Sequence, residues 1–157
     1  MSPVCVSTWH GEGAKHWHAF MATAKRNGIE PQNADPDFWP GTTWQDKEWF
    51  RKSQAQARFV REHKDEFSHF MFVDSHDILF ACGWDEIMRK FLDYESPIVF
   101  GAECYPWPNQ QQADEYPASI FRCRYLNAGF WMAESGAAMA LLTEIEQVAA
   151  KRLQCDQ

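Results

Sequence analysis

Apolar runs alternate along the chain with amphipathic stretches, and four of these runs have the length and the β-branched or aromatic content of strands. These runs cover residues 4–8, 70–73, 97–102 and 124–132. Four other stretches have apolar residues at helical spacing. They cover residues 14–26, 43–64, 84–94 and the segment that begins at Ser135, a helix-capping residue. Because helices separate most of the strands, the pattern predicts an α/β fold with a mostly parallel central sheet and right-handed crossovers.

Two segments follow neither pattern. Residues 30–42 are rich in Pro, Gly, Asn and Asp, which predicts an irregular loop, and residues 109–117 are polar enough for an exposed loop. Trp39 lies in the first of these loops, where it either packs the loop onto the body of the protein or offers a flat ring on which a base stacks. Asn127 and Gly129 interrupt an otherwise strand-like run and predict a turn against a ligand.

The apolar run 70–73 ends in two carboxylates, Asp74 and Asp77, three positions apart. Side chains three apart in a strand point to opposite faces, so the two acids converge only if the chain leaves strand geometry after Asp74. Ligands of open α/β sheets bind beyond the carboxyl ends of strands. Two carboxylates at such a place suit a hard divalent cation that takes further oxygens from a substrate phosphate. The pattern therefore predicts a metal–diphosphate site, with a solvated turn as the alternative.

The helix predicted over residues 43–64 carries basic side chains, most of them on a solvated face. They are Lys47, Arg51, Lys52, Arg58 and Arg61. One of those near the start of the helix can reach a phosphate or a sugar, and the pattern does not say which.

The chain of 157 residues has a formal net charge of −7, which argues against a broad nucleic-acid-binding face because such a face needs a basic footprint. It shows neither an N-terminal signal pattern nor a run of about 20 apolar residues, so we expect a cytoplasmic protein without a membrane partner. Its cysteines are odd in number and form no C-x-x-C pair, which favours free thiols in a reducing compartment. They are Cys5, Cys82, Cys104, Cys123 and Cys155.

Four blocks of sequence, taken together, resemble a known family. They are F-V-D-S-H-D-I-L-F at 72–80, G-A-E-C-Y-P-W-P at 101–108, R-Y-L-N-A-G-F at 124–130 and D-Q at 156–157. In this order they resemble the glycosyltransferase domain of the procollagen lysyl hydroxylases and procollagen galactosyltransferases, and a viral or bacterial relative would suit a chain of this length. The resemblance implies that residues 1–157 form one domain, a GT-A type, Rossmann-like three-layer sandwich. It also implies transfer of a hexose from a UDP-sugar to a hydroxyl acceptor, with Mn²⁺ or Mg²⁺ as cofactor.

The resemblance implies roles for individual residues as well. Asp74 and Asp77 fall on the metal ligands of the family. The residues expected to bind the donor are Thr8, Trp39, Asp74, His76 and Trp107. Those expected to hold the transferred sugar and the acceptor hydroxyl, as catalytic residues, are Glu103, Asn127 and Asp156.

The chain departs from the family pattern at two places. His76 stands where the family usually has a tyrosine between its metal acids, so the donor preference is open. The family also continues beyond its D-D-Q segment to a late histidine that binds metal, whereas position 155 is Cys and the sequence ends two residues later. We therefore expect either a fragment or a minimal domain that completes its site with other residues.

Two alternatives to glycosyl transfer stay open. A nucleotidyltransferase also needs a metal, a diphosphate and a doubly wound sheet, but it would want basic residues around the turn at 9–13, and only Lys15 is near. A non-catalytic remnant of a transferase would instead act as a binding module. For a transferase, the sequence does not identify the acceptor, which can be hydroxylysine, a glycan or a hydroxylated DNA base. The net charge disfavours the DNA base.

Overall fold

The computed structural model describes residues 1–8, 17–36, 48–75, 77–106 and 110–155, and their side chains except at 48–50 and 151–155. The strands in these ranges are β1 (Ser2–Ser7), β2 (Gln32–Asn33), β3 (Phe67–Val73), β4 (Ile98–Glu103) and β5 (Tyr125–Glu134). They form one sheet in the order β2-β1-β3-β5-β4. Strand β1 is parallel to β2 and β3, whereas β5 is antiparallel to both β3 and β4. Four strands thus share one direction, and the prediction of a mostly parallel sheet is confirmed.

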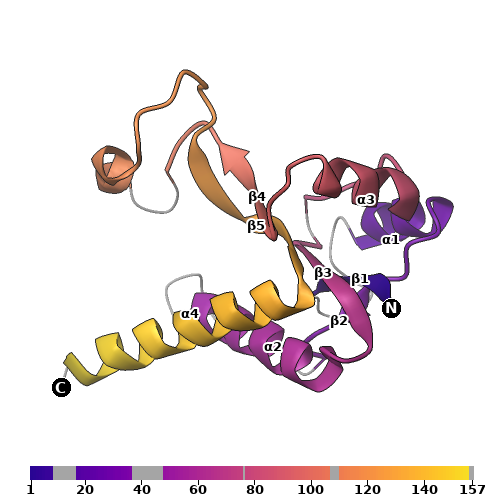
Figure 1. Cartoon of the computed structure of the whole chain (residues 1–157), viewed down its shortest axis with the longest axis horizontal. Helices are drawn as coiled ribbons and strands as arrows, with labels where there is room; N and C mark the ends of the chain where they lie inside the picture. Colours follow the sequence, from indigo (N-terminus) through magenta and orange to yellow (C-terminus); the bar gives the residue numbers. More distant parts are fainter. Residues whose placement is uncertain (9–16, 37–47, 76, 107–109, 156–157) are drawn as a thin grey trace.

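Helices cover both faces of the sheet (Figure 1). They are α1 (Trp17–Arg26), α2 (Glu48–His63), α3 (Trp84–Leu92) and α4 (Ser135–Cys155). Helices α2 and α4 lie on one face, and α1 and α3 lie on the other. The result is a three-layer arrangement with the sheet in the middle. None of the helices in the described ranges is long and apolar enough to cross a membrane.

Alternation along the central strands divides the core into two halves. Phe70 and Phe72 of β3 pack toward α2 and α4, whereas Met71 and Val73 pack toward α1 and α3. All four side chains are buried, because a strand in the middle of a covered sheet presents both faces to apolar layers. On the α2 side, Phe72 stacks on Trp131 of β5 with a centroid distance of 4.2 Å. The buried central strand that the apolar run predicts is therefore present, and it begins three residues earlier than predicted.

Several predicted details differ from the structure. The segment 30–42, predicted as a loop, contains the short strand β2, which pairs with β1 through Val6 and Gln32. The polar segment 109–117 contains a short 3₁₀ helix, η1 (Gln110–Glu115). Asn127 and Gly129, predicted to lie in a turn, belong to strand β5. The predicted starts of the first two helices, at residues 14 and 43, lie outside the described residues.

Helix α4 begins at Ser135, the residue predicted to cap it. The hydroxyl group of Ser135 donates a hydrogen bond to the carbonyl oxygen of Lys64 at 2.9 Å. This contact ties the start of α4 to the chain just beyond α2, so the two helices on this face of the sheet are joined at one end.

Candidate functional site

The carboxyl ends of β1 and β3 are held together by two buried serines. The Ser7 hydroxyl donates to the carbonyl oxygen of Val73 at 2.6 Å, and the Ser75 hydroxyl donates to that of Thr8 at 3.1 Å. Both serines are almost fully buried, so water does not compete for these hydrogen bonds. They fix Thr8 and Asp74 side by side where the two parallel strands end. We call residues 7–8 and 73–75 the strand-end region.

A bulge in β5 brings further polar groups to the strand-end region. Phe100 of β4 pairs with Trp131, but Gly101 pairs with Asn127, so three residues of β5 have no opposite residue in β4. The Asn127 side-chain oxygen accepts hydrogen bonds from the backbone N–H groups of Gly129 (2.7 Å) and Phe130 (3.2 Å). The bulge therefore keeps two of its backbone donors satisfied, and Phe130 at its end pairs with Val73 of β3.

Gly129 leaves room for the carboxylate of Asp74. The Asp74 N–H donates to the Gly129 carbonyl oxygen at 2.8 Å. A Cβ atom on Gly129 would lie 2.8 Å from Asp74 Oδ2 and 2.9 Å from Asn127 Oδ1, closer than real Cβ contacts come. The carboxylate and the carboxamide thus converge on a space that only glycine leaves open.

Lys52 of α2 supplies a positive charge to this place. Its ammonium group donates to Asp74 Oδ1, and it lies 3.4 Å from the carbonyl oxygen of Ala128. The Lys52 side chain is 22% exposed and that of Asp74 is 36% exposed, so the pair is partly shielded from water. Asp74 therefore already accepts a cation in this structure.

The other basic residues described on α2 have different partners. Arg51 donates to the buried carboxylate of Asp35 at 2.8 Å, and Arg58 lies 3.8 Å from the same group. Arg61 pairs with Glu146 of α4. Lys47 lies outside the described residues. Among the described members of the basic set, Lys52 is thus the residue that reaches the predicted metal acid.

The remaining predicted site residues are not joined to this cluster by described contacts. Asp77 is exposed in the turn after Asp74. Glu103 is the last residue of β4, half-buried and paired with Tyr125 of β5. Four residues lie outside the described part of the chain: Trp39, His76, Trp107 and Asp156.

The groups at the strand-end region fit a hard divalent cation. Asp74 offers a carboxylate that accepts a cation already, and the missing side chain of Gly129 leaves space beside it. Within the described residues, no group of three or more His, Cys, Asp or Glu side chains is gathered to hold a metal ion. A cation held by one or two carboxylates, waters and substrate phosphates is ordinary for Mg²⁺. The strand-end region therefore suits a divalent cation that binds together with a phosphate ligand.

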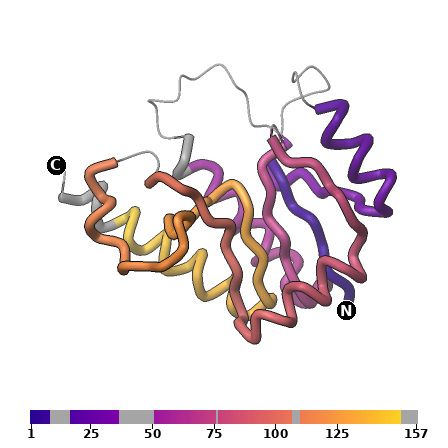
Figure 2. Tube along the Cα trace, turned by 90° about the horizontal axis from the view of Figure 1, so that it is seen from above, coloured from indigo at the N-terminus to yellow at the C-terminus, as the bar shows by residue number. Residues whose placement is uncertain are grey.

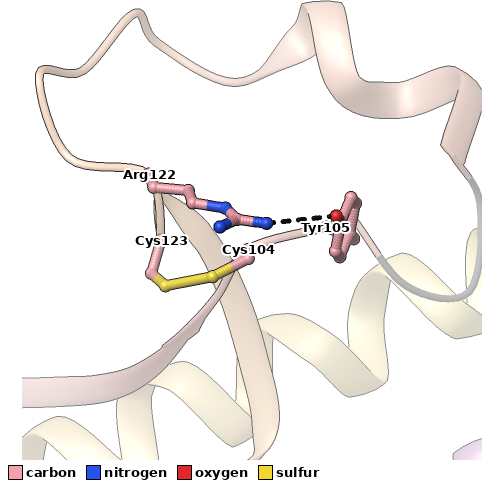
Figure 3. Close-up of a disulfide and its surroundings, with 4 residues drawn as sticks. All are labelled: Cys104, Tyr105, Arg122 and Cys123. Atoms are coloured by element: carbon pink, nitrogen blue, oxygen red, sulfur yellow. Dashed lines mark hydrogen bonds between the residues drawn. A yellow bond between two sulfur atoms is a disulfide. The ribbon is translucent and has the colours of Figure 1, made fainter.

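Between β4 and β5 the chain makes a long excursion, residues 104–124, which we call the arm. Its described residues project from the sheet on the side of the molecule away from α1 (Figures 1 and 2). A disulfide joins Cys104 to Cys123 across the base of the arm, and the Arg122 guanidinium donates to the Tyr105 hydroxyl at 3.3 Å beside it (Figure 3). The prediction that these two cysteines are free thiols is wrong.

Arg124 holds the described backbone of the arm from within. Its guanidinium donates to the carbonyl oxygens of Pro117 (2.7 Å), Tyr116 (2.9 Å) and Ala113 (3.3 Å). It also lies over the Tyr125 ring, 4.7 Å from the centroid. Two apolar side chains of the arm contribute little packing, since Ile120 is 95% exposed and Phe121 is 70% exposed, whereas the Tyr116 ring packs edge-on against Tyr125. One disulfide, the hydrogen bonds of Arg124 and this ring contact hold the described part of the arm.

Cys5 and Cys82 are free thiols, as predicted. Cys5 lies buried in the middle of β1, and burial raises its pKa to about 12. The thiol is therefore protonated at neutral pH, and it is not a nucleophile.

Sequence reasoning left Lys52 undecided, although a signal was present. Lys52 lies three, four and seven residues before Ala55, Gln56 and Phe59, which are buried. This spacing places it on the inward face of α2, so its ammonium group has to find a partner inside the molecule.

The sequence model of the family described as the PLOD GT domain matches residues 6–157. Human procollagen-lysine,2-oxoglutarate 5-dioxygenase 2 is 35% identical over 134 residues, which are 80% of this chain and 17% of that protein. The multifunctional procollagen lysine hydroxylase and glycosyltransferase of Caenorhabditis elegans is 36% identical over 85 residues, which are 52% of this chain and 12% of that protein. The chain thus spans less than a fifth of the length of these relatives.

A solved structure shares the architecture. It is the crystal structure of a glycosyltransferase involved in the glycosylation of the major capsid of PBCV-1, with a TM-score of 0.51 and 11% identity. The match covers 92% of this chain and 65% of the other. At this identity the likeness concerns the fold alone, and it confirms the predicted GT-A type α/β sandwich.

Proposed function

Since the chain belongs to the PLOD GT domain family and is a glycosyltransferase domain, we propose that it transfers a hexose from a UDP-sugar to a hydroxyl acceptor with the help of a divalent cation. The observation that carries this proposal is the placement of Asp74. It stands at the carboxyl end of a central strand, beside Thr8, and its carboxylate accepts a cation. Such a place is where open α/β sheets bind their ligands.

The donor would occupy the strand-end region. Asp74 and Asp77 would hold Mn²⁺ or Mg²⁺, and Thr8, Trp39, His76 and Trp107 would orient the nucleoside and its sugar. When bound, the cation supplies charge neutralisation for the leaving diphosphate. The carboxylate of Asp74 would keep its position because the backbone around Asp74 is fixed by the contacts of Ser75 and Gly129.

The acceptor side would be formed by Glu103, Asn127 and Asp156. Asn127 uses its side-chain oxygen on the backbone of the bulge, which leaves its NH₂ group to donate to a sugar hydroxyl. Glu103 stands at the end of β4, next to the base of the arm. Holding both reactants here makes the attack of the acceptor effectively unimolecular.

Among the possible acceptors, hydroxylysine in a polypeptide has the support of the relatives, whose names include procollagen lysine hydroxylase. The compartment is a separate question. Disulfides persist in oxidising compartments, so the Cys104–Cys123 pair gives no support to the reducing cytoplasm that the cysteine pattern predicts.

Calorimetry with UDP in the presence and absence of Mn²⁺ tests the proposal. We expect Mn²⁺ to strengthen UDP binding and Asp77→Asn to remove this effect, while Asp93→Asn, at an exposed acid paired with Arg89, leaves it intact. Equal affinity for UDP with and without Mn²⁺ would contradict the metal site. Slow release of UDP from a UDP-sugar marks a transferase, binding without release marks a remnant, and exchange of pyrophosphate into a nucleotide marks a nucleotidyltransferase.

A further inference from the structure

Lys52 occupies the place at Asp74 that a metal ion would take. The ammonium group contacts Asp74 Oδ1, and the Ala128 carbonyl oxygen at 3.4 Å gives it a second acceptor. It arrives from α2, whereas the Cβ position of Gly129 faces the other carboxylate oxygen, Oδ2. One carboxylate oxygen thus faces Lys52 and the other faces the space at Gly129.

We propose that Lys52 is a built-in counter-cation of Asp74, which a divalent cation displaces only when a diphosphate is present to receive the ammonium group. The inference rests on the proposed function, because it concerns the same metal and donor. Lys52 would then be the residue that makes binding of the metal depend on binding of the donor. The site would then stay closed to free metal ions and open to the complex of metal and donor.

Charge balance gives the physical reason. Lys52 and Asp74 together are neutral, so a divalent cation that arrives alone adds two positive charges next to an ammonium group. Like charges at such a short separation repel strongly where water is partly excluded. A diphosphate supplies the missing negative charge and a strong acceptor for the ammonium group. Metal and diphosphate must then strengthen each other's binding by the same factor.

Within the described residues, the other basic side chains of α2 do not pair with Asp74. Arg51 and Arg58 are held by the buried Asp35, and Arg61 pairs with Glu146. The Lys52 stem is partly buried on the inward face of α2, so its ammonium group can swing only over a short range around Asp74. A lysine suits this exchange because its charge is compact and its stem is flexible.

The test compares Lys52→Gln with the unchanged chain by calorimetry of Mn²⁺ alone, UDP alone and UDP in saturating Mn²⁺. We expect Lys52→Gln to bind Mn²⁺ alone about tenfold more tightly, UDP alone with unchanged affinity and UDP in saturating Mn²⁺ about tenfold more weakly. The coupling factor between Mn²⁺ and UDP then falls by about tenfold, within the usual range of such couplings. Lys52→Arg keeps the charge and should retain much of the coupling. Lys64→Gln, whose partner is the exposed Asp65, is the matched control and should change nothing.

The inference is overturned if Lys52→Gln binds Mn²⁺ alone no more tightly than the unchanged chain and keeps the full coupling. Failure of the proposed function gives a different result, because the unchanged chain would then show no coupling between Mn²⁺ and UDP at all. A second measurement needs no variant. In nuclear magnetic resonance of labelled lysines, the Lys52 side-chain signal should move on addition of Mg²⁺ with UDP and stay in place with Mg²⁺ alone. Movement with Mg²⁺ alone would equally overturn the inference.

Discussion

The strand-end region and the arm lie on neighbouring parts of the sheet, yet different forces hold them. In the strand-end region, ladder hydrogen bonds and two buried serines fix the backbone. In the arm, one disulfide and the guanidinium of Arg124 hold the backbone in place without a strand ladder. The first region therefore depends on the whole core, and the second depends on a few side chains. We expect changes in each region to have separable effects, and the predictions below test that separation.

The largest effect is expected from Asp74→Asn. The substitution keeps the size of the side chain but removes the charge that holds the cation and Lys52. Loss of residues that merely support metal ligands costs about 10–100-fold, so loss of a ligand should weaken UDP binding in Mn²⁺ by more than about 100-fold. Calorimetry measures this, with Asp65→Asn as an exposed control. An unchanged affinity would remove Asp74 from the site.

Removal of the disulfide should affect the arm and leave the donor site alone. For Cys104→Ser with Cys123→Ser, the lost restraint on a loop of this size is worth about 3 kcal/mol of unfolding free energy in the chain-entropy model. Urea denaturation measures it, with Cys82→Ser as the free-thiol control. Affinity for UDP in Mn²⁺ should change less than about twofold. A joint loss of stability and of donor binding would show that the two regions are one unit.

The thiol count gives a direct check on the cross-link itself. Denatured protein that has not been reduced should react with two fewer equivalents of a thiol reagent than reduced protein. Equal counts would mean that Cys104 and Cys123 are not joined.

Gly129→Ala probes the junction between the bulge and Asp74. The new methyl group would meet Asp74 Oδ2 at 2.8 Å and Asn127 Oδ1 at 2.9 Å, so the carboxylate has to move. Overpacking of this kind costs about 1–3 kcal/mol, and we expect UDP binding in Mn²⁺ to weaken about tenfold. Gly136→Ala is the matched control, because no atom lies within 4 Å of its Cβ position. Equal effects of the two substitutions would contradict the close approach at Gly129.

The smallest effect should come from His69, which lies near the start of β3 and away from both regions. Burial lowers the pKa of His69, while the charge of Glu134 opposes the shift. A folded pKa below the unfolded value means that the unfolded chain binds the proton more readily. Stability should therefore be fully present above the ordinary histidine pKa and fall as the pH drops through it toward the folded pKa. Thermal melts of His69→Gln should lack this part of the pH dependence, with His18→Gln, at an exposed position of α1, as the control.

The sequence predicted the centre of the sheet well because local patterns determine it. The apolar run at 70–73 and the acid that follows it correspond to β3 and Asp74. Strand β2 was missed since it has two residues and depends on pairing with β1 rather than on its own composition. The reversed direction of β5 has a signal in the sequence. No helical pattern lies between residues 103 and 125, and parallel neighbours need a crossover, usually a helix.

The contacts of the candidate site needed the fold. Glu103 pairs with Tyr125, so the next residues outward bring Cys104 near Cys123. Cysteine spacing alone does not show this, because the two residues meet only once β4 and β5 are adjacent. The same holds for Lys52 and Asp74, which are 22 residues apart in sequence and meet only when α2 packs on the sheet. Long-range contacts of this kind have no local pattern.

The disulfide also changes what a single cut in the chain would do. Residues 104–123 and the sulfur bridge form a closed covalent ring, and the exposed Arg122 offers trypsin a peptide bond inside it. Cleavage there would open the ring without parting the molecule, since the bridge and the β4–β5 pairing would still join the two pieces. Such a protein would run as one band on a denaturing gel until a reductant was added, and then as two. A nicked molecule with an intact strand-end region would be a two-piece form of this domain with new chain ends on the arm.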